Sequence, residues 1–195
     1  MHPAAALAYA FAYVAVLALG ARVAATSRGR QVTATTVAGA IALLSVPWVM
    51  FPDAVWVSLS VYGLLVVFHL LVIAAVAQHL LEVRSNRDVL FAGTSLYVLA
   101  GDLFVPAGMI VHLVTRLLTG AAAYGVDGPV DWQQMVYVSF TTLTTLGRDA
   151  LQPVTAAAQA LAIAEATVGV VILAVIIARL VVAEVTAGVL RRHGA

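Results

Sequence analysis

Uninterrupted apolar sequence constrains this chain more than any other feature. Between Arg30 and Glu82 the only charged residue is Asp53, which follows Pro52. Hydrophobic residues make up 63% of the 195 residues and charged residues 10%, whereas a soluble domain has about 25% charged residues. Because so few polar side chains cannot cover a surface that faces water, we predict an integral membrane protein that is surrounded by the lipid bilayer.

The lengths of the apolar stretches predict five transmembrane helices in an all-α fold. A helix needs about 20 apolar residues to cross a hydrocarbon core about 30 Å thick. The Pro52–Asp53 pair divides the longest stretch into two spans. The first stretch lacks a positively charged segment before it and has the length of a span, so we interpret it as a span rather than a signal peptide. The five predicted spans are residues 4–24, 33–51, 54–78, 89–117 and 155–185.

A sixth apolar segment, residues 132–146, is too short to be a span. Its length is typical of a re-entrant or an interfacial helix. Backbone that is not helical is tolerated at membrane depth only where protein surrounds it or where it lines a water-filled cavity. A helix that enters the membrane and stops therefore indicates a pore. From helix length alone, the alternative is an amphipathic helix on the membrane surface.

The distribution of arginine predicts the orientation of the spans. All ten basic residues are arginine, and cytoplasmic loops of membrane proteins carry an excess of basic residues. With five spans, Arg116 and Arg148 fall on one side and the other eight on the opposite side. We therefore predict a multi-pass protein of the plasma membrane with its N-terminus outside and its C-terminus in the cytoplasm. The eight cytoplasmic residues are Arg22, Arg28, Arg30, Arg84, Arg87, Arg179, Arg191 and Arg192.

Composition and spacing exclude several classes of function. The chain has no cysteine, which excludes disulfides, thiolate metal sites and cysteine nucleophiles. A net charge of +1 without a long basic run gives no reason to expect nucleic acid as a partner. The carboxylates and histidines within the spans show no catalytic or metal-binding spacing, so we predict no enzymatic activity, no metal and no cofactor. We interpret His69 and His112 as residues that form hydrogen bonds between helices.

The sequence from Tyr137 onward reads YVSFTTLTTLGRDALQPVTAAAQALAIAEATVGVVILAVIIARLV. This stretch resembles the pore helix, filter and inner helix of the bacterial two-transmembrane-helix potassium-channel pore domain family, a family of ion channels. The family pattern is close to YFSF-T-LTT-GYGD-P, followed by an inner helix with an acidic residue, a glycine and a closing A-R-L. The upstream segment SLYVLAGDLF resembles the outer helix of the same family. The matching positions are Tyr137, Ser139, Phe140, Leu143, Thr144, Thr145, Gly147, Pro153, Glu165, Gly169, Ala178, Arg179 and Leu180.

The resemblance covers residues 87–187 and implies a tetrameric-channel architecture. It divides the chain into a three-helix N-terminal membrane region, residues 1–86, and a channel-like pore domain, residues 87–195. Within the pore domain it implies a pore helix at 132–145, a filter at 145–150 and an inner helix at 155–187. It further implies an ion channel subunit that forms a homotetramer. The implied ion pathway contains Thr144, Thr145, Leu146, Gly147, Arg148 and Asp149.

The chemistry of this segment agrees with cation conduction. The C-terminus of a helix carries about half a negative charge, so a pore helix that ends near Thr144 would favour a cation in the membrane interior. The following carbonyl groups can replace the hydration shell of an ion. Thr145 adds a hydroxyl oxygen, and Gly147 allows backbone conformations that a β-carbon forbids. The alternative is a threonine-rich helix end whose hydroxyls bond to its own backbone.

The filter differs from the family where selectivity arises. Over residues 145–150 the chain reads TLGRDA where the family reads TVGYGD, so Arg148 takes the aromatic position and Asp149 the second glycine. If Asp149 pairs with Arg148, the pore is a wide, weakly selective path for monovalent cations, potassium among them. If the four arginines of a tetramer stay unpaired, they block cations or favour anions. The alternative function is a non-conducting membrane scaffold or sensor that retains the pore fold.

Polar and small residues within the spans complete the candidates, because charges at membrane depth are costly and usually functional. Asp102 in the outer helix is expected to accept a hydrogen bond from a neighbouring helix or from Arg116. Glu165 in the inner helix either braces the filter from behind or faces the pore, and we favour bracing. Gly169 either allows the inner helix to bend during gating or lets two helices pack closely.

Overall fold

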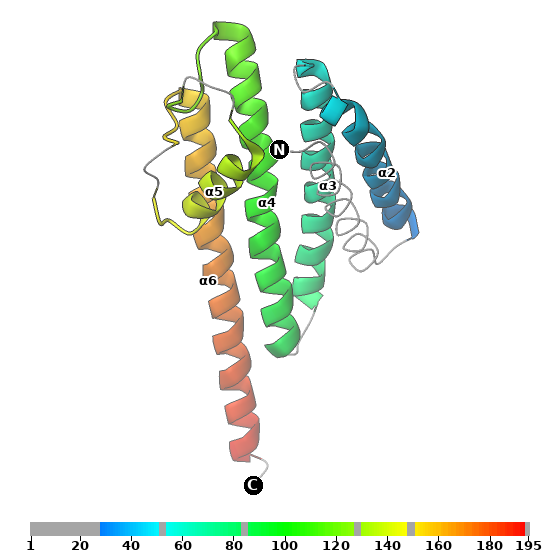
Figure 1. Ribbon diagram of the computed structural model, residues 1–195. Coiled ribbons are helices and arrows are strands. Elements are labelled where there is room, and N and C mark those ends of the chain that lie inside the picture. The colour runs from blue at the N-terminus through cyan, green and yellow to red at the C-terminus, as the bar shows by residue number, and fades with distance from the viewer. Residues whose placement is uncertain (1–27, 51–53, 83–85, 127–129, 148–150, 194–195) are drawn as a thin grey trace.

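The computed structural model describes residues 28–50, 54–82, 86–126, 130–147 and 151–193. These residues form helices, as Figure 1 shows, and the described part of the chain contains no β-strand. The first predicted span, residues 4–24, lies outside the described residues. The helices are α2 (Arg28–Met50), α3 (Val55–Glu82), α4 (Asn86–Thr119), α5 (Trp132–Leu143) and α6 (Ala156–His193).

Three of these helices have the length and composition of membrane spans. They are Val55–Glu82 in α3, Arg87–Thr119 in α4 and Ala156–Val182 in α6. The apolar stretch of α2, Thr35–Trp48, is shorter. The structure thus confirms an all-helical protein with the character of a membrane protein. The five-span topology, the plasma membrane and the orientation of the termini stay predictions.

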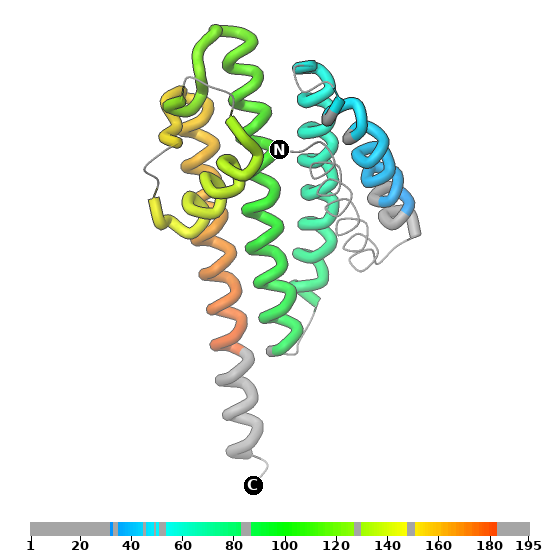
Figure 2. Tube along the Cα trace, in the orientation of Figure 1, coloured from blue at the N-terminus to red at the C-terminus, as the bar shows by residue number. Residues whose placement is uncertain are grey.

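The long helices pack side by side in the order α2, α3, α4 and α6, and α5 lies against α4 and α6. In Figure 1, α5 runs obliquely downward across α6 and ends part of the way along it, whereas α6 itself begins at the upper end. The trace in Figure 2 follows the same course. With 12 residues, α5 is only about 18 Å long at 1.5 Å per residue. It is therefore too short to cross a bilayer, and its re-entrant course stays a prediction.

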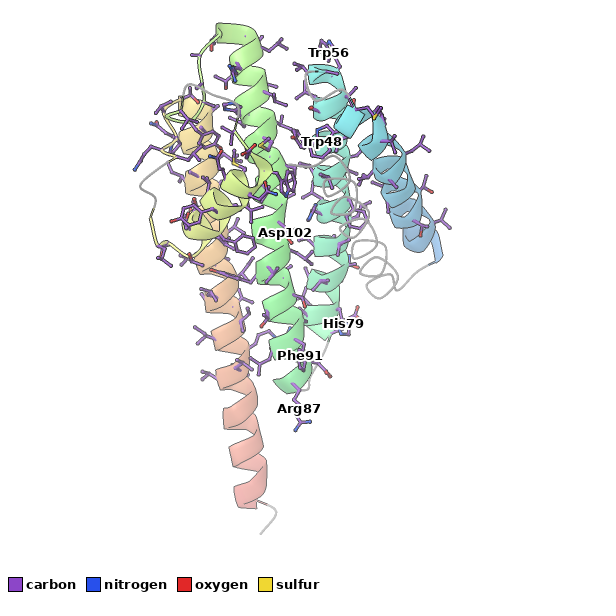
Figure 3. All side chains as sticks on the ribbon, viewed as in Figure 1. Trp48, Trp56, His79, Arg87, Phe91 and Asp102 are labelled. Carbon is purple, nitrogen blue, oxygen red and sulfur yellow. The ribbon has the colours of Figure 1, made fainter. Side chains whose placement is uncertain are left out.

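The two ends of the helix bundle differ in chemistry. Trp56 is 74% exposed and lies at the end where α3 begins, whereas His79 and Arg87 lie at the opposite end (Figure 3). Tryptophan is enriched at membrane interfaces, and arginine is enriched in cytoplasmic loops. The orientation of these two ends relative to the cytoplasm stays a prediction.

The main hydrophobic core joins the N-terminal helices to the short helix α5. On α3, the buried residues Val61, Leu65, Phe68 and Val72 recur at three- to four-residue spacing, which places them on one helix face. The core that this face forms extends across residue 86, where the sequence predicted a boundary between two regions. It also contains Ala38 and Ile41 of α2, Val105 and Met109 of α4, and Met135 and Val138 of α5.

The ring of Tyr62 in α3 contacts both α2 and α5. Trp48 lies edge-on to it with 6.1 Å between the ring centroids, and Trp132 stacks on it at 5.9 Å with an angle of 21° between the ring planes. Such aromatic pairs contribute roughly 0.5–1.5 kcal/mol beyond the burial of their area. Because Trp132 is the first residue of α5, the N-terminal helices hold the start of this helix.

Candidate functional site

Helix α5 satisfies its own polar groups along most of its length. At its start, the backbone N–H of Asp131 donates to Gln134 Oε1 at 2.9 Å, which is one half of a capping box. The hydroxyls of Thr141, Thr142 and Thr144 each donate to the carbonyl four residues earlier at 2.7 Å. These hydroxyls therefore form the side-chain-to-backbone bonds of an ordinary threonine-rich helix. The backbone that follows the helix offers further oxygen atoms.

The helix ends at Leu143 because the chain reverses direction there. Thr145 adopts a left-handed conformation with φ 57°. Its N–H donates to the carbonyl of Thr142 at 2.9 Å, and the N–H of Leu146 donates to the carbonyl of Thr141 at 2.9 Å. These two bonds define a Schellman motif, in which the left-handed residue is usually glycine. The helix is thus shorter than the range 132–145 that the sequence predicted, because threonine takes the turning position that glycine usually marks.

The four residues after the helix are exposed, and their carbonyl groups have no partner within the described residues. Residues 144–147 are all exposed, and the side chain of Leu146 is 80% exposed. Within the described part of the chain, no group donates a hydrogen bond to the four carbonyl oxygens of this segment. Backbone carbonyls away from water are almost always paired, so these oxygens are available to a ligand or to water. Arg148 and Asp149, the remaining predicted pathway residues, lie outside the described residues.

The last residue of α5 is held between α4 and α6. The hydroxyl of Tyr97 in α4 donates to the carbonyl oxygen of Leu143 at 3.2 Å. From the other side, Gly169 of α6 approaches so closely that a Cβ there would overlap this oxygen and lie 3.1 Å from Leu143 Cδ1. Gly169 therefore permits a close approach of the two helices. Its predicted role as a bend during gating stays a prediction.

A second link joins the same three helices one turn earlier. The hydroxyl of Ser139 in α5 lies 2.7 Å from the carbonyl oxygen of Gly101 in α4, and it also forms a hydrogen bond with Glu165 Oε1 of α6. Ser139 is 1% exposed and Glu165 is 4% exposed. The carboxyl of Glu165 thus lies against the buried side of α5, which is the position that bracing of the filter requires; the bracing role itself stays a prediction.

Asp102 takes part in neither link. It lies on α4 beside Gly101, and its side chain is half-buried. No hydrogen bond or ion pair joins it to another described residue. The expected bond from Arg116 of the same chain is wrong, because 14 residues of one helix separate the two by about 21 Å at 1.5 Å per residue. The role of Asp102 in bracing or gating stays a prediction.

The two histidines within the spans differ in their hydrogen bonding. His69 Nδ1 lies 2.7 Å from the carbonyl oxygen of Leu65, one turn earlier in its own helix. His112 is 2% exposed, and neither of its ring nitrogens has a partner among the described residues. The expected bond from His112 to another helix is therefore not formed within this part of the chain. The described residues also contain no group of three or more metal-ligating side chains.

Sequence reasoning missed the contribution of α4 to this site. Tyr97 was not predicted to hold the end of α5. A usable signal was the spacing of Gly93, Gly101 and Gly108, because small residues that recur along one face of a membrane helix indicate close packing. A Cβ at these positions would lie 2.6 to 2.9 Å from side-chain atoms of α5 or α6. The glycines thus mark the face of α4 against which α5 and α6 pack.

Comparison with known proteins agrees with this geometry. Residues 108–185 match the model of a family described as Ion channel. The match begins within α4, includes α5 and the segment after it, and extends through most of α6. No curated protein and no solved structure matches the chain. The family match supports an ion channel family and so points to membrane transport rather than to enzymatic catalysis.

The left-handed turn at Thr145 allows a direct test of this local structure. A β-branched residue in this conformation costs roughly 1–2 kcal/mol, so we expect Thr145→Gly to stabilise the protein by about 1 kcal/mol. Thr144 has φ −83° in the right-handed region, so Thr144→Gly is expected to destabilise it by about 0.5–1 kcal/mol. Thermal unfolding in detergent measures both variants. A shift of the same sign in both would contradict the assigned turn.

Proposed function

We propose that the chain is an ion channel subunit that forms a homotetrameric, weakly selective cation pore in the plasma membrane. The observation that carries this proposal is the segment 144–147. Its four consecutive carbonyl oxygens accept no hydrogen bond from the described residues, and it directly follows a short helix whose last residue touches α6 at Gly169. Carbonyl oxygens in this arrangement can replace the hydration shell of a cation.

The electrostatics of α5 support a cation rather than an anion at this position. Helix α5 ends at Leu143, and the aligned peptide dipoles place about half a negative charge at that end. In a fourfold arrangement, four such ends would surround one axis. Many exposed side chains of α6 are apolar, among them Ile163, Val170 and Ile177, so one subunit leaves much of this helix uncovered. Other subunits and lipid can pack against such an apolar surface.

The proposal of weak selectivity rests on Arg148 and Asp149, which follow the segment 144–147 in the sequence. Four copies of Arg148 would surround the outer mouth of a tetramer. Two unit charges 10 Å apart repel by about 0.4 kcal/mol in water and about 1.7 kcal/mol at an effective dielectric constant of 20. A neighbouring Asp149 that pairs with each arginine would remove this barrier and leave a wide path for monovalent cations, including potassium.

Ion flux through purified protein in liposomes tests the proposal. We expect cation flux under both potassium and sodium gradients, less than about tenfold preference between the two ions, and little flux of chloride. The variant Arg148→Tyr/Asp149→Gly, which carries the family residues at these positions, is expected to conduct with a stronger preference for potassium. Absence of flux for every ion in both proteins would refute the channel. Conduction by the variant alone would favour a non-conducting scaffold.

The oligomeric state provides an independent measurement. A single subunit supplies one filter segment and cannot surround an ion path, so we expect the mass of a tetramer for the protein in detergent. Light scattering coupled to size-exclusion chromatography gives this mass without reference to conduction. A protein that remains monomeric at all concentrations would exclude the pore.

A further inference from the structure

The hydroxyl of Ser139 lies between two oxygen atoms that belong to different helices. One is the carbonyl oxygen of Gly101 in α4, at 2.7 Å, and the other is Oε1 of Glu165 in α6. A serine hydroxyl has one hydrogen to donate, and a backbone carbonyl oxygen can only accept. The contact with Gly101 is therefore a hydrogen bond only if Ser139 donates to it. The hydrogen in the contact with Glu165 then has to come from Glu165.

The protonation state of Glu165 follows from this count of hydrogens. An ionised carboxylate only accepts hydrogen bonds, whereas a protonated carboxyl group has one O–H to donate. If Glu165 were ionised, the single hydrogen of the Ser139 hydroxyl could bond to either Gly101 O or Glu165 Oε1. The other contact would then bring two acceptor oxygens together without a hydrogen between them. With a protonated Glu165, both contacts are hydrogen bonds. We propose that Glu165 is held as a neutral carboxylic acid that donates to Ser139, which in turn donates to Gly101, and that this chain positions the end of α5.

The surroundings of the carboxyl group favour the neutral form. Glu165 is 4% exposed and Ser139 is 1% exposed, and the transfer of an ionised carboxylate out of water is far more costly than that of a neutral acid. This cost of ionisation favours the neutral acid at the buried position of Glu165.

The position of this chain of hydrogen bonds explains its effect on the filter. Ser139 lies four residues before Leu143, so the chain acts one helical turn from the last residue of α5. At that last residue, Tyr97 and Gly169 hold the carbonyl group of Leu143. Two links therefore fix both the axial position and the rotation of the turn that precedes residues 144–147. Glu165 is a positioning residue, and this part of the inference rests on the proposed function.

Infrared spectroscopy tests the protonation state without reference to ion flux. In protein that carries isotope-labelled glutamate at neutral pH, we expect the C=O stretching band of a protonated carboxylic acid. The band should disappear in Glu165→Gln and remain in Asp102→Asn. It should shift in Ser139→Ala, because the acid then loses the oxygen to which it donates. Identical spectra of the wild type and Glu165→Gln in this region would overturn the proposal.

Ion flux in liposomes tests the positioning role. The amide N–H of glutamine can donate to Ser139 in place of the acid, so Glu165→Gln is expected to retain at least about half of the wild-type flux. Methionine is similar in size but has no donor, so Glu165→Met is expected to reduce flux by about tenfold or more. Equal flux in both variants would overturn positioning. A protonated band in a wild-type protein without flux would refute the channel and leave the neutral acid established.

Discussion

Replacement of Gly169 with alanine is expected to destabilise the protein more than the addition of a methyl group at any glycine that faces open space. A Cβ at this position would overlap the backbone oxygen of Leu143 and lie 3.2 Å from its carbonyl carbon. Backbone atoms cannot move aside as the end of a flexible side chain can, so α6 has to shift away from α5. Overpacking of this kind costs about 1–3 kcal/mol, and we expect Gly169→Ala to lie at the upper end of that range.

Gly63 in α3 provides a matched control, because a Cβ there would meet no atom within 4 Å. Glycine in the interior of a helix is less stable than alanine by roughly 0.5–1 kcal/mol, so Gly63→Ala is expected to stabilise the protein slightly. Thermal unfolding in detergent measures both effects. In liposomes, Gly169→Ala should also lose ion flux, since the displaced helix end carries the segment 144–147. Equal stability of the two alanine variants would show that the helices are not in contact at Gly169.

Substitution of Arg179 with methionine is the second change for which we expect a large effect. The guanidinium of Arg179 in α6 donates to the carbonyl oxygen of Leu80 in α3. Leu80 is 3% exposed, and its carbonyl is among the last four of α3, which have no partner within the helix. Loss of a hydrogen bond from a charged donor to such a group costs about 1.5–3 kcal/mol. The positive charge also stabilises the negative end of the α3 dipole.

Arg87 is the matched control for this experiment. It is exposed and lies near the beginning of α4 (Figure 3). Surface substitutions away from buried contacts change stability by at most about 0.5 kcal/mol, so Arg87→Met is expected to leave the unfolding temperature nearly unchanged. Arg179→Lys keeps a charged donor and should fall between Arg179→Met and the wild type. If Arg179→Met and Arg87→Met unfolded at the same temperature, the contact between α6 and α3 would contribute nothing.

The contact of Arg179 also gives this residue a structural role that the sequence did not predict. In the sequence, Arg179 counted toward the cytoplasmic excess of arginine and toward a family pattern. In the structure it links the inner helix α6 to the N-terminal helix α3. Together with the stacking of Tyr62 on Trp132, this contact connects α3 to both the start of α5 and α6. Helix α3 therefore contacts the two elements that form the proposed pore.

The sequence by itself determined the class of this protein. Low charge and long apolar stretches require a membrane. The length of each stretch distinguishes the spans from the short helix α5, because the number of residues in a helix can be compared directly with the thickness of the bilayer. It also placed the segment 144–147 after a helix end. The last turn of that helix was harder to predict from the sequence, because the left-handed residue is Thr145 rather than the glycine that usually marks such a turn.

Only the tertiary structure decided which residues hold the helix end in place. Tyr97 and Leu143 are 46 positions apart, Ser139 and Gly101 are 38 apart, and Arg179 and Leu80 are 99 apart. Helical periodicity shows which face of a helix is apolar, but it does not show which turn of another helix lies opposite. That pairing depends on the close approaches that the glycines of α4 and α6 permit. For this reason the sequence could identify Glu165 as a candidate residue. The inference that Glu165 is neutral depends on the contacts of Ser139, which only the packing of the helices shows.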